Sequence, residues 1–498
     1  MTLTLRPAVF AIALALAGSA GAADLMDAYE LARTSDPQLA AAQARRAAQA
    51  QGVPIERAAL LPQVTGSLGL SDTDRSGESI DAFPGPDGEL QFGRSVSSSD
   101  SRSRSSGLRL QQSLYDHSNY TTLRASKARS LQSGAELDAA ADQLMLRVAE
   151  AYFNVLTAID ALVFARAEER AVGRQLDQAD QRFEVGLTAI TDVHEARARF
   201  DQSRAGAITA ENTLNDAREA LAEITGEYLQ NFQGLGPEFE PTLPAPADIA
   251  AWVQTALAEN PVLHARELAL VAAGHDVATA RSGHLPTLGA FVDYGDTAGW
   301  GDSRFGGLNV PADSTGYSTT IGVQLNVPIF SGFATSARVR QSVHSRDAVE
   351  DELEQQRRAV TRQTRTTYRT LIAGISEISA RQQGLVSAQS ALEATEAGFE
   401  VGTRTIVDVL LSQQVLFQAQ RDYSNARHNF LVNTLRLKQS AGVIAADDMQ
   451  QVNRLLVRDA EAALAQPEEV APEDAPAGLQ MEDATAPAVD DAEADDDA

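Results

Sequence analysis

The chain has 498 residues, no cysteine and a formal net charge of −27. This acidic balance argues against nucleic acid as a partner, because nucleic-acid binding requires a basic surface. The absence of cysteine excludes disulfide bonds and thiolate metal sites, so packing and assembly must hold the fold together.

The first 22 residues have the pattern of a secretory signal peptide. One charge, Arg6, precedes an apolar stretch from Ala8 to Ala17, and Ala20-Gly21-Ala22 fits a cleavage site of small residues. We expect residues 1–22 to be removed, because the apolar stretch is shorter than the roughly 20 residues that span a bilayer. We expect no later segment to cross a membrane as a helix, so the exported chain is either soluble or a transmembrane β-barrel.

The rest of the sequence contains one unit twice. RFEVGLTAITDV at 182–193 returns as GFEVGTRTIVDV at 398–409, an offset of 216. Other matches keep the same order at offsets of 216 or 224: Asp24 and Asp248, Pro37 and Pro261, Tyr152 and Tyr368, and Gly226 and Gly442. An ordered series of this kind indicates an internal duplication.

The duplication and the local composition divide the chain into five parts after the signal peptide. We expect a first repeat at 23–234, a Pro-rich linker at 235–247, a second repeat at 248–442, an equatorial segment at 443–466 and an acidic tail at 467–498. The tail has many acids and no Lys or Arg, so it cannot bury a core and should be disordered.

Each repeat begins with an Ala-rich helical stretch and continues into strands. The helical stretches should run from Leu25 to about Arg57 and from Ile249 to about Arg281. Alternating apolar and polar residues then predict strands at about 63–72, 107–116, 287–295 and 317–330. Their length of about ten residues suits a transmembrane β-strand, although a soluble two-faced strand has the same local pattern. Long polar loops, one of them from Asp72 to Ser106, should connect the strands.

A long helical hairpin should close each repeat, at 118–226 and at 334–442. Residues 118–183 contain no proline, and their apolar positions step by three and four, which is typical of coiled-coil packing. Gly186 and Gly402 lie where a C-terminal helix glycine is expected. Thr191-Asp192 and Asp408 then lie where we expect the cap of the returning helix.

This architecture requires several copies of the chain. Four strands cannot close a barrel around a lumen, and unpaired strand edges in lipid cost several kcal/mol for each backbone group. We therefore expect an oligomeric tube, with a short shared β-barrel above a long helical cylinder.

Several long strings resemble the outer membrane factor family, the TolC-type trimeric channels of bacterial efflux pumps and type I secretion systems. The strings are AYFNVLTAID, RQLDQ, RFEVGLTAITDV, GHLPTL, SAQSALEATEAGF and VGTRTIVDVL, and the likeness runs from about Asp24 to Gly442. The resemblance implies a mixed α and β membrane protein, a homotrimer with a twelve-stranded transmembrane β-barrel and a periplasmic α-helical barrel. The implied function is a passive exit duct in the outer membrane, without cofactor or metal. The implied partners are a periplasmic adaptor (membrane fusion) protein, an inner-membrane transporter of the RND or ABC type, and outer-membrane lipid.

The resemblance also implies a gate at the periplasmic end of the helical barrel. Arg404 matches an arginine that bonds to a Thr-Asp pair, here Thr191 and Asp192, and Gln175 and Glu396 match a second bonded pair. An ordinary surface ion pair, worth about 0–1 kcal/mol, is the alternative for Arg404 and Asp192.

Two departures from the family pattern lie at the same gate. Phe399 replaces a tyrosine that would bond to the aspartate, so the closed state should open more easily. Asp408 matches one of two acidic rings at the pore constriction, and Leu411 stands where the other would be. Cation selectivity should therefore be weaker than in the family, unless Asp408 serves only as a helix cap.

The hairpin tips resemble the surface on which adaptors dock. The residues are Gly186, Leu187, Gly402 and Thr403, and the glycines also serve as turn residues.

Three other functions fit less well. An exported soluble coiled-coil or structural envelope protein is a serious alternative, which would leave the envelope without detergent. A general porin would need many more strands than four in one chain. An enzyme has little support, since His194-Glu195 begins a zinc motif whose second histidine is replaced by Ala198.

Overall fold

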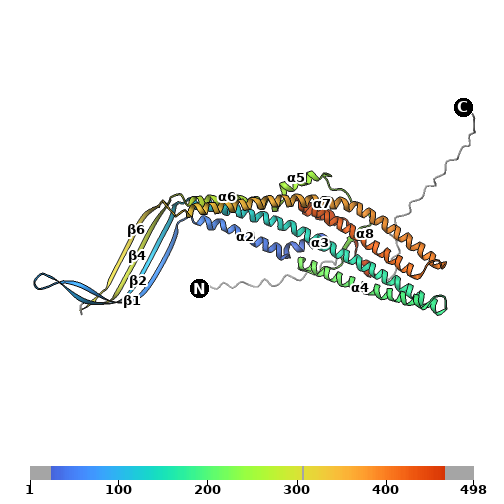
Figure 1. Ribbon diagram of the computed structural model, residues 1–498, viewed down its shortest axis with the longest axis horizontal. Coiled ribbons are helices and arrows are strands. Elements are labelled where there is room, and N and C mark those ends of the chain that lie inside the picture. The colour runs from blue at the N-terminus through green and yellow to red at the C-terminus, as the bar shows by residue number, and fades with distance from the viewer. Residues whose placement is uncertain (1–23, 306–307, 466–498) are drawn as a thin grey trace, which may run out of the picture.

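The protein is elongated, with a long helical body and an antiparallel sheet that extends from one end (Figure 1). The computed structural model describes residues 24–305 and 308–465, so the predicted signal peptide at 1–22 and the tail at 467–498 lie outside the described residues. The combination of long helices and antiparallel strands confirms the mixed α and β fold class.

Each half opens with two short helices rather than one. They are α1 (Leu25–Ser35) and α2 (Pro37–Ala58), then α5 (Ile249–Glu259) and α6 (Pro261–Ser282). The sequence pattern predicts a helical stretch in each half but not this break. The residue before a proline is pushed out of the helical region, and Asp36 and Asn260 accordingly have ψ angles of 119° and 117°. Their side chains then cap the next helix, since Asp36 accepts the Leu39 N–H at 2.7 Å.

The sheet has longer strands than the sequence pattern predicts. Its members are β1 (Gln63–Pro84), β2 (Leu90–Tyr115), β4 (Thr287–Phe305), β5 (Leu308–Pro311) and β6 (Ser314–Asn326). The order is β1–β2–β4, with β5 and β6 both pairing with β4. The expected loop from Asp72 to Ser106 was wrong, because it is a β-hairpin that pairs from Gln63↔Gln111 to Pro84↔Leu90. The predicted strand at 317–330 also ran past its actual end at Asn326.

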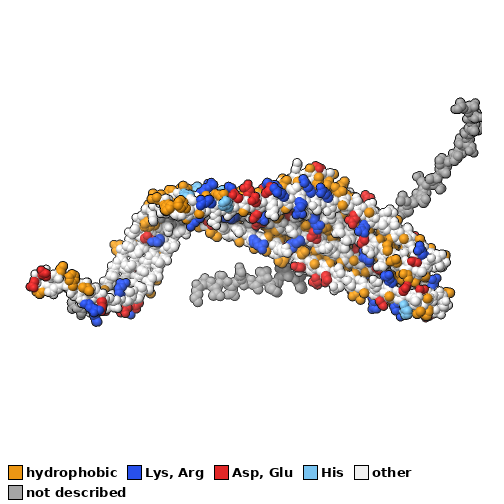
Figure 2. All heavy atoms as spheres, viewed as in Figure 1, with side chains coloured by type: hydrophobic (Ala, Val, Ile, Leu, Met, Phe, Trp, Pro, Cys, Tyr) orange, Lys and Arg blue, Asp and Glu red, His pale blue; other side chains and the backbone are white. Residues whose placement is uncertain are grey.

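The two faces of the sheet differ in polarity. One face carries an apolar row across all four main strands, because Val64 pairs with Leu110, Leu110 with Val292, and Val292 with Ile321. The other face is rich in serine, threonine and glycine, and the sheet face turned to the viewer in Figure 2 is mostly white, the colour of such residues and of backbone. A single chain leaves the apolar row exposed to solvent.

Four long helices form two hairpins. The first consists of α3 (His117–Glu184) and α4 (Ile190–Thr225), and the second of α7 (Ala334–Glu400) and α8 (Ile406–Ala441). Contrary to expectation, α3 contains a stretch that is long and apolar enough to cross a membrane, but 61% of that stretch is buried inside the protein. Burial of this kind is typical of a core helix.

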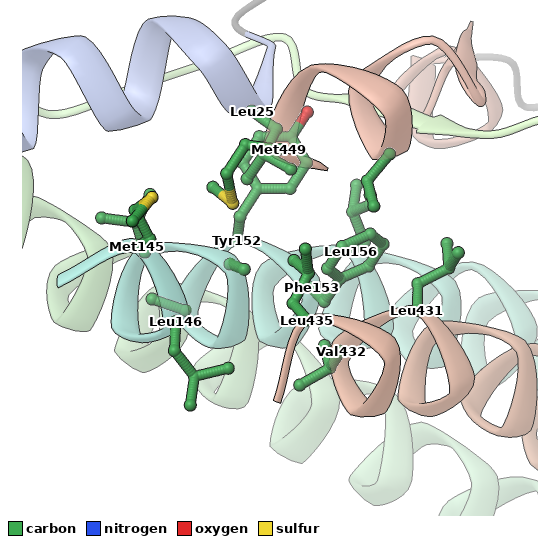
Figure 3. Close-up of a cluster of buried hydrophobic side chains, with 14 of the residues drawn as sticks. Leu25, Met145, Leu146, Tyr152, Phe153, Leu156, Leu431, Val432, Leu435 and Met449 are labelled. Atoms are coloured by element: carbon green, nitrogen blue, oxygen red, sulfur yellow. The ribbon is translucent and has the colours of Figure 1, made fainter. Parts of the chain in front are cut away.

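The remaining elements gather around the middle of the helical body. They are β3 (Gln233–Leu235), α9 (Ala446–Asn453), β7 (Leu456–Asp459) and α10 (Ala462–Ala465), with β3 pairing with β7. The main core lies beside them, where side chains of α3 and α8 interdigitate beneath α1 and α9 (Figure 3). Tyr152 is fully buried there, and its hydroxyl donates to the Gln233 carbonyl at 2.8 Å.

The end of α8 fits closely against the break between α5 and α6. Gly442 caps α8 with a φ of 72°, and a Cβ at this position would lie 2.6 Å from the Glu259 carbonyl oxygen. The Asn260 amide donates to the Ser440 carbonyl at 3.0 Å. Gly226 of the first repeat has a φ of 76°, and its Cβ would lie 3.0 Å from the Ser35 side chain. The duplicated glycines therefore lie at two equivalent joints, where the end of a helical hairpin packs against the break between the two short helices of the same half.

A buried histidine links α3 and α8 inside the core. His428 contacts Thr157 through Nδ1 at 3.0 Å, and its Nε2 lies 3.9 Å from the Asp160 carboxylate. Burial lowers the pKa of His428; Asp160 opposes this shift and Arg427 adds to it. Desolvation is the largest influence, so we assign the neutral form at pH 7 despite the nearby carboxylate.

The folded protein should lose stability in acid partly because of His428. The unfolded chain gains a proton at this residue below its ordinary pKa of about 6.5, while the folded chain resists protonation. Stability from this group is therefore complete above that pH and falls by about 1.4 kcal/mol for each pH unit below it, down to the folded pKa. We expect His428→Gln to flatten the decline in melting temperature between pH 7 and pH 5. His344→Gln is the control, since His344 is 81% exposed, and an equal effect of both variants would contradict the prediction.

Candidate functional site: the hairpin tips

The two hairpin tips have the same backbone turn. In the first, the Gly186 N–H donates to Phe183 at 2.9 Å and the Leu187 N–H to Arg182 at 2.8 Å. In the second, the equivalent bonds to Phe399 and Gly398 measure 3.0 and 2.9 Å. Gly186 and Gly402 have φ angles of 76° and 79°, which side chains disfavour. Each turn is a Schellman motif that satisfies the last carbonyls of the outgoing helix.

The returning helices begin earlier than the sequence suggests. The cap of α4 is Ala189, and Asp192 lies in the first turn, where its carboxylate accepts the Thr188 hydroxyl. The cap of α8 is Thr405, whose hydroxyl accepts the Asp408 N–H at 3.3 Å. The expectation of caps at Thr191-Asp192 and Asp408 was therefore wrong in position. Ala189 precedes Thr191 by two residues, and Thr405 precedes Asp408 by three. A capping-box search of the sequence would find the Thr405–Asp408 pair.

Asp408 is strongly held in its ionised form. The Thr405 backbone N–H and hydroxyl both donate to its carboxylate at 2.9 Å. These hydrogen bonds, led by that from the backbone, lower the pKa of Asp408, and the positive charge of Arg404 adds a smaller contribution. The helix N-terminus also favours a negative charge here. Asp408 is thus both the carboxylate partner of the Thr405 cap and a persistent anion near the tip.

An apolar cluster joins the two hairpins just above the tips. We call it the tip cluster, and its buried members are Val172, Ala179, Val193, Ala196, Ile406 and Leu410. The first four belong to α3 and α4, and the last two to α8. Phe399 packs both against this cluster and against a second one on α7 and α8. Sequence reasoning missed the tip cluster, although Ile406 and Leu410 have the four-residue spacing of one helix face.

The residues for which the family resemblance implies polar contacts do not contact one another within one chain. Among the described residues, Arg404 forms no ion pair with Asp192 or any other carboxylate of its own chain, and Thr191 is exposed. The Gln175 side-chain oxygen is buried without a hydrogen-bond partner in this part of the structure. Glu396 instead accepts from Gln413 at 3.5 Å, on the same hairpin. These contacts remain predictions.

The outer surface of the tips is apolar and open. Leu187 is 76% exposed, and Val185 and Val401 beside the turns are similarly exposed. Leu411, near the start of α8, is 51% exposed, whereas its neighbour Leu410 is buried. An exposed apolar surface at the end of a long helical body suits contact with another protein.

Comparison with known proteins identifies relatives along most of the chain. A family model described as "Outer membrane efflux protein" matches residues 28–227 and 252–443. Outer membrane protein TolC of Vibrio cholerae is 36% identical over 442 residues, which cover 88% of this chain and 95% of the relative. Alkaline protease secretion protein AprF of Pseudomonas aeruginosa is 31% identical, with 89% of both chains covered.

The fold matches solved channel structures at lower identity. The CmeC outer membrane channel of Campylobacter jejuni has a TM-score of 0.68 at 17% identity, covering 92% of this chain and 98% of that one. This likeness supports the fold alone.

Proposed function

We propose that three copies of this chain form one duct. The chain belongs to the outer membrane efflux protein family and is a non-enzymatic efflux or secretion channel of the outer membrane. The observation that carries the proposal is the sheet, whose β1 and β6 edges have no partner strand among the described residues of one chain. Pairing of β6 with β1 of the next copy would close a barrel of twelve main strands. Its apolar row would then face outer-membrane lipid, and the serine-rich face would line the lumen.

The trimer can be tested with paired cysteines, since the chain has none of its own. One cysteine replaces a residue of β1, such as Leu68, and the other a residue of β6, such as Val323, with the register scanned in steps of two. We expect oxidation to link three chains in the outer membrane. A monomeric mass in mild detergent, with no register that crosslinks, would contradict the proposal.

We also propose that an adaptor docks on the tips and opens the gate for an inner-membrane transporter. The exposed Leu187, Val185 and Val401 provide the apolar surface for such contact. A photoreactive residue at Leu187 should capture the adaptor in living cells. Capture of an adaptor from an RND pump would indicate drug efflux, and one from an ABC exporter would indicate protein secretion, as AprF's name states for that relative. Failure at several neighbouring tip positions would contradict docking here.

The gate should depend on Arg404. Its side chain is exposed and forms no ion pair within residues 24–305 and 308–465 of its own chain. We therefore propose that it bonds to Thr191 and Asp192 of a neighbouring copy, with Gln175 and Glu396 as a second contact. We expect Arg404→Ser to raise the conductance of purified channels in planar bilayers by several-fold, since an exposed ion pair contributes about 0–1 kcal/mol in each copy. Arg174→Ser, on the exposed face of α3, is the control, and unchanged conductance in Arg404→Ser would remove Arg404 from the gate.

Cation selectivity should depend on Asp408 and increase when Leu411 is made acidic. Three Asp408 carboxylates around a narrow pore attract cations, and their hydrogen bonds with Thr405 keep them charged. We expect Asp408→Ala to reduce the cation preference measured by reversal potentials. Leu411→Asp should strengthen it, because the exposed site accepts a charge and adds a second ring. No change in either variant would place both residues outside the constriction.

A further inference from the structure

The last turns of α3 and α7 are joined by an interaction outside the polar contacts discussed above. The Arg182 guanidinium carbon lies 4.6 Å from the centroid of the Phe399 ring. Arg182 belongs to the outgoing helix of the first hairpin and Phe399 to that of the second. Among the described residues no carboxylate lies within ion-pair distance of Arg182, so this ring is its one charged or aromatic partner there.

We propose that Arg182 and Phe399 form a cation–π latch that positions the second hairpin against the first and favours the closed gate. This inference rests on the proposed gating of the channel. Phe399 has no hydroxyl and cannot donate a hydrogen bond, but its ring face attracts a guanidinium. The cation–π contact therefore links the two hairpins in place of the hydrogen bond that a hydroxyl at this position would form.

The surroundings of Phe399 fix the ring for this contact. Phe399 packs between the tip cluster and the second cluster on α7 and α8, so its orientation is set by neighbours on both sides. Arg182 is partly buried, which limits screening of its charge by water. Movement of the second hairpin away from the first must separate the guanidinium from the ring, because the two groups lie on different hairpins. The latch can thus distinguish closed from open arrangements.

A helix-dipole role for Arg182 is the alternative to the latch, and the two roles make different predictions. Arg182 is the basic residue in the last turn of α3, where a positive charge also complements the helix dipole. A dipole effect does not depend on Phe399, whereas a cation–π contact disappears when either partner is removed. Coupling between the two residues is therefore the deciding measurement.

The test compares R182Q, F399L and the double variant as purified channels in planar bilayers. We expect each single variant to raise the ratio of open to closed channels by about ten-fold, since three latches open together in the trimer. The double variant should raise it no further than the single variants. R182K should lie between wild type and R182Q, because an ammonium also binds the ring face. R174Q is the matched control, since Arg174 lies two turns earlier on the exposed side of α3.

Two outcomes would overturn the latch: unchanged gating in R182Q, or effects of R182Q and F399L that multiply in the double variant. Neither outcome touches the proposed channel, provided that the wild type conducts and a tip-cluster variant opens it. Absence of any conductance in both would instead refute the proposed function. The thermal stability of each variant trimer should be measured alongside its conductance. Equal stabilities would show that the comparison reports gating rather than folding.

Discussion

Leu410→Ala is expected to shift the channel strongly towards its open state. Leu410 is 4% exposed and fills the tip cluster between α8 and the first hairpin. Truncation of a buried leucine to alanine costs about 2–5 kcal/mol. If opening separates the hairpins, this cost falls on the closed arrangement and favours opening by about 30-fold or more in each chain. The effect should exceed that of any single polar gate variant.

The measurement is channel conductance, together with uptake of a large hydrophilic dye by cells. Val415→Ala is the matched control, because Val415 lies on the same helix and is 52% exposed. We expect the control to conduct like the wild type. Equal conductance of the Leu410 and Val415 variants would show that the tip cluster does not hold the gate.

Gly442→Ala should lower the stability of the helical body more than other replacements of a glycine by alanine there. Alanine pays about 1–2 kcal/mol for the left-handed conformation that Gly442 adopts at a φ of 72°. Its Cβ would also lie 2.6 Å from both the Glu259 carbonyl oxygen and the Asn260 Cα, which are backbone atoms and cannot rotate away. Displacement of a packed backbone adds about 1–3 kcal/mol, for a total of about 2–5 kcal/mol.

Gly402→Ala separates the two contributions. Gly402 has a φ of 79°, but a Cβ there meets nothing within 4 Å. We expect the temperature at which Gly402→Ala dissociates and unfolds to be a few degrees below that of the wild type. For Gly442→Ala this temperature should fall by at least twice as much. Equal shifts would mean that the α5–α6 break yields easily and that the joint is not tightly packed.

Regular patterns in the sequence predicted some elements well, and their limits have physical causes. The halves of the strands next to the helical body alternate between apolar and polar residues because one face of the sheet is apolar, as at Val64 and Leu68. The outer halves were missed because serine, glycine and charges occupy both faces between Asp72 and Ser106, although backbone pairing continues there. The helix break at Asp36-Pro37 was also missed, although the residue before a proline disfavours helix.

At the hairpin tips, local turns could be predicted but contacts between hairpins could not. Gly186 and Gly402 identified the tips, because a positive φ has a direct signature in residue type. The approach of Arg182 to Phe399 and the burial of Leu410 against Val193 depend on how two hairpins far apart in sequence are packed. The four-residue spacing of Ile406 and Leu410 indicates an apolar helix face, but a single sequence does not show which hairpin covers that face.

The repeated turn at Gly186 and Gly402 has a consequence for symmetry. A trimer would present six turns of one backbone shape in a ring, a pseudo-sixfold arrangement built from threefold symmetry. The shapes match but the chemistry alternates, since Leu187 follows one glycine and Thr403 the other. A ring of six identical partner subunits would therefore meet two kinds of binding site in turn, and its members would differ in affinity and in order of release.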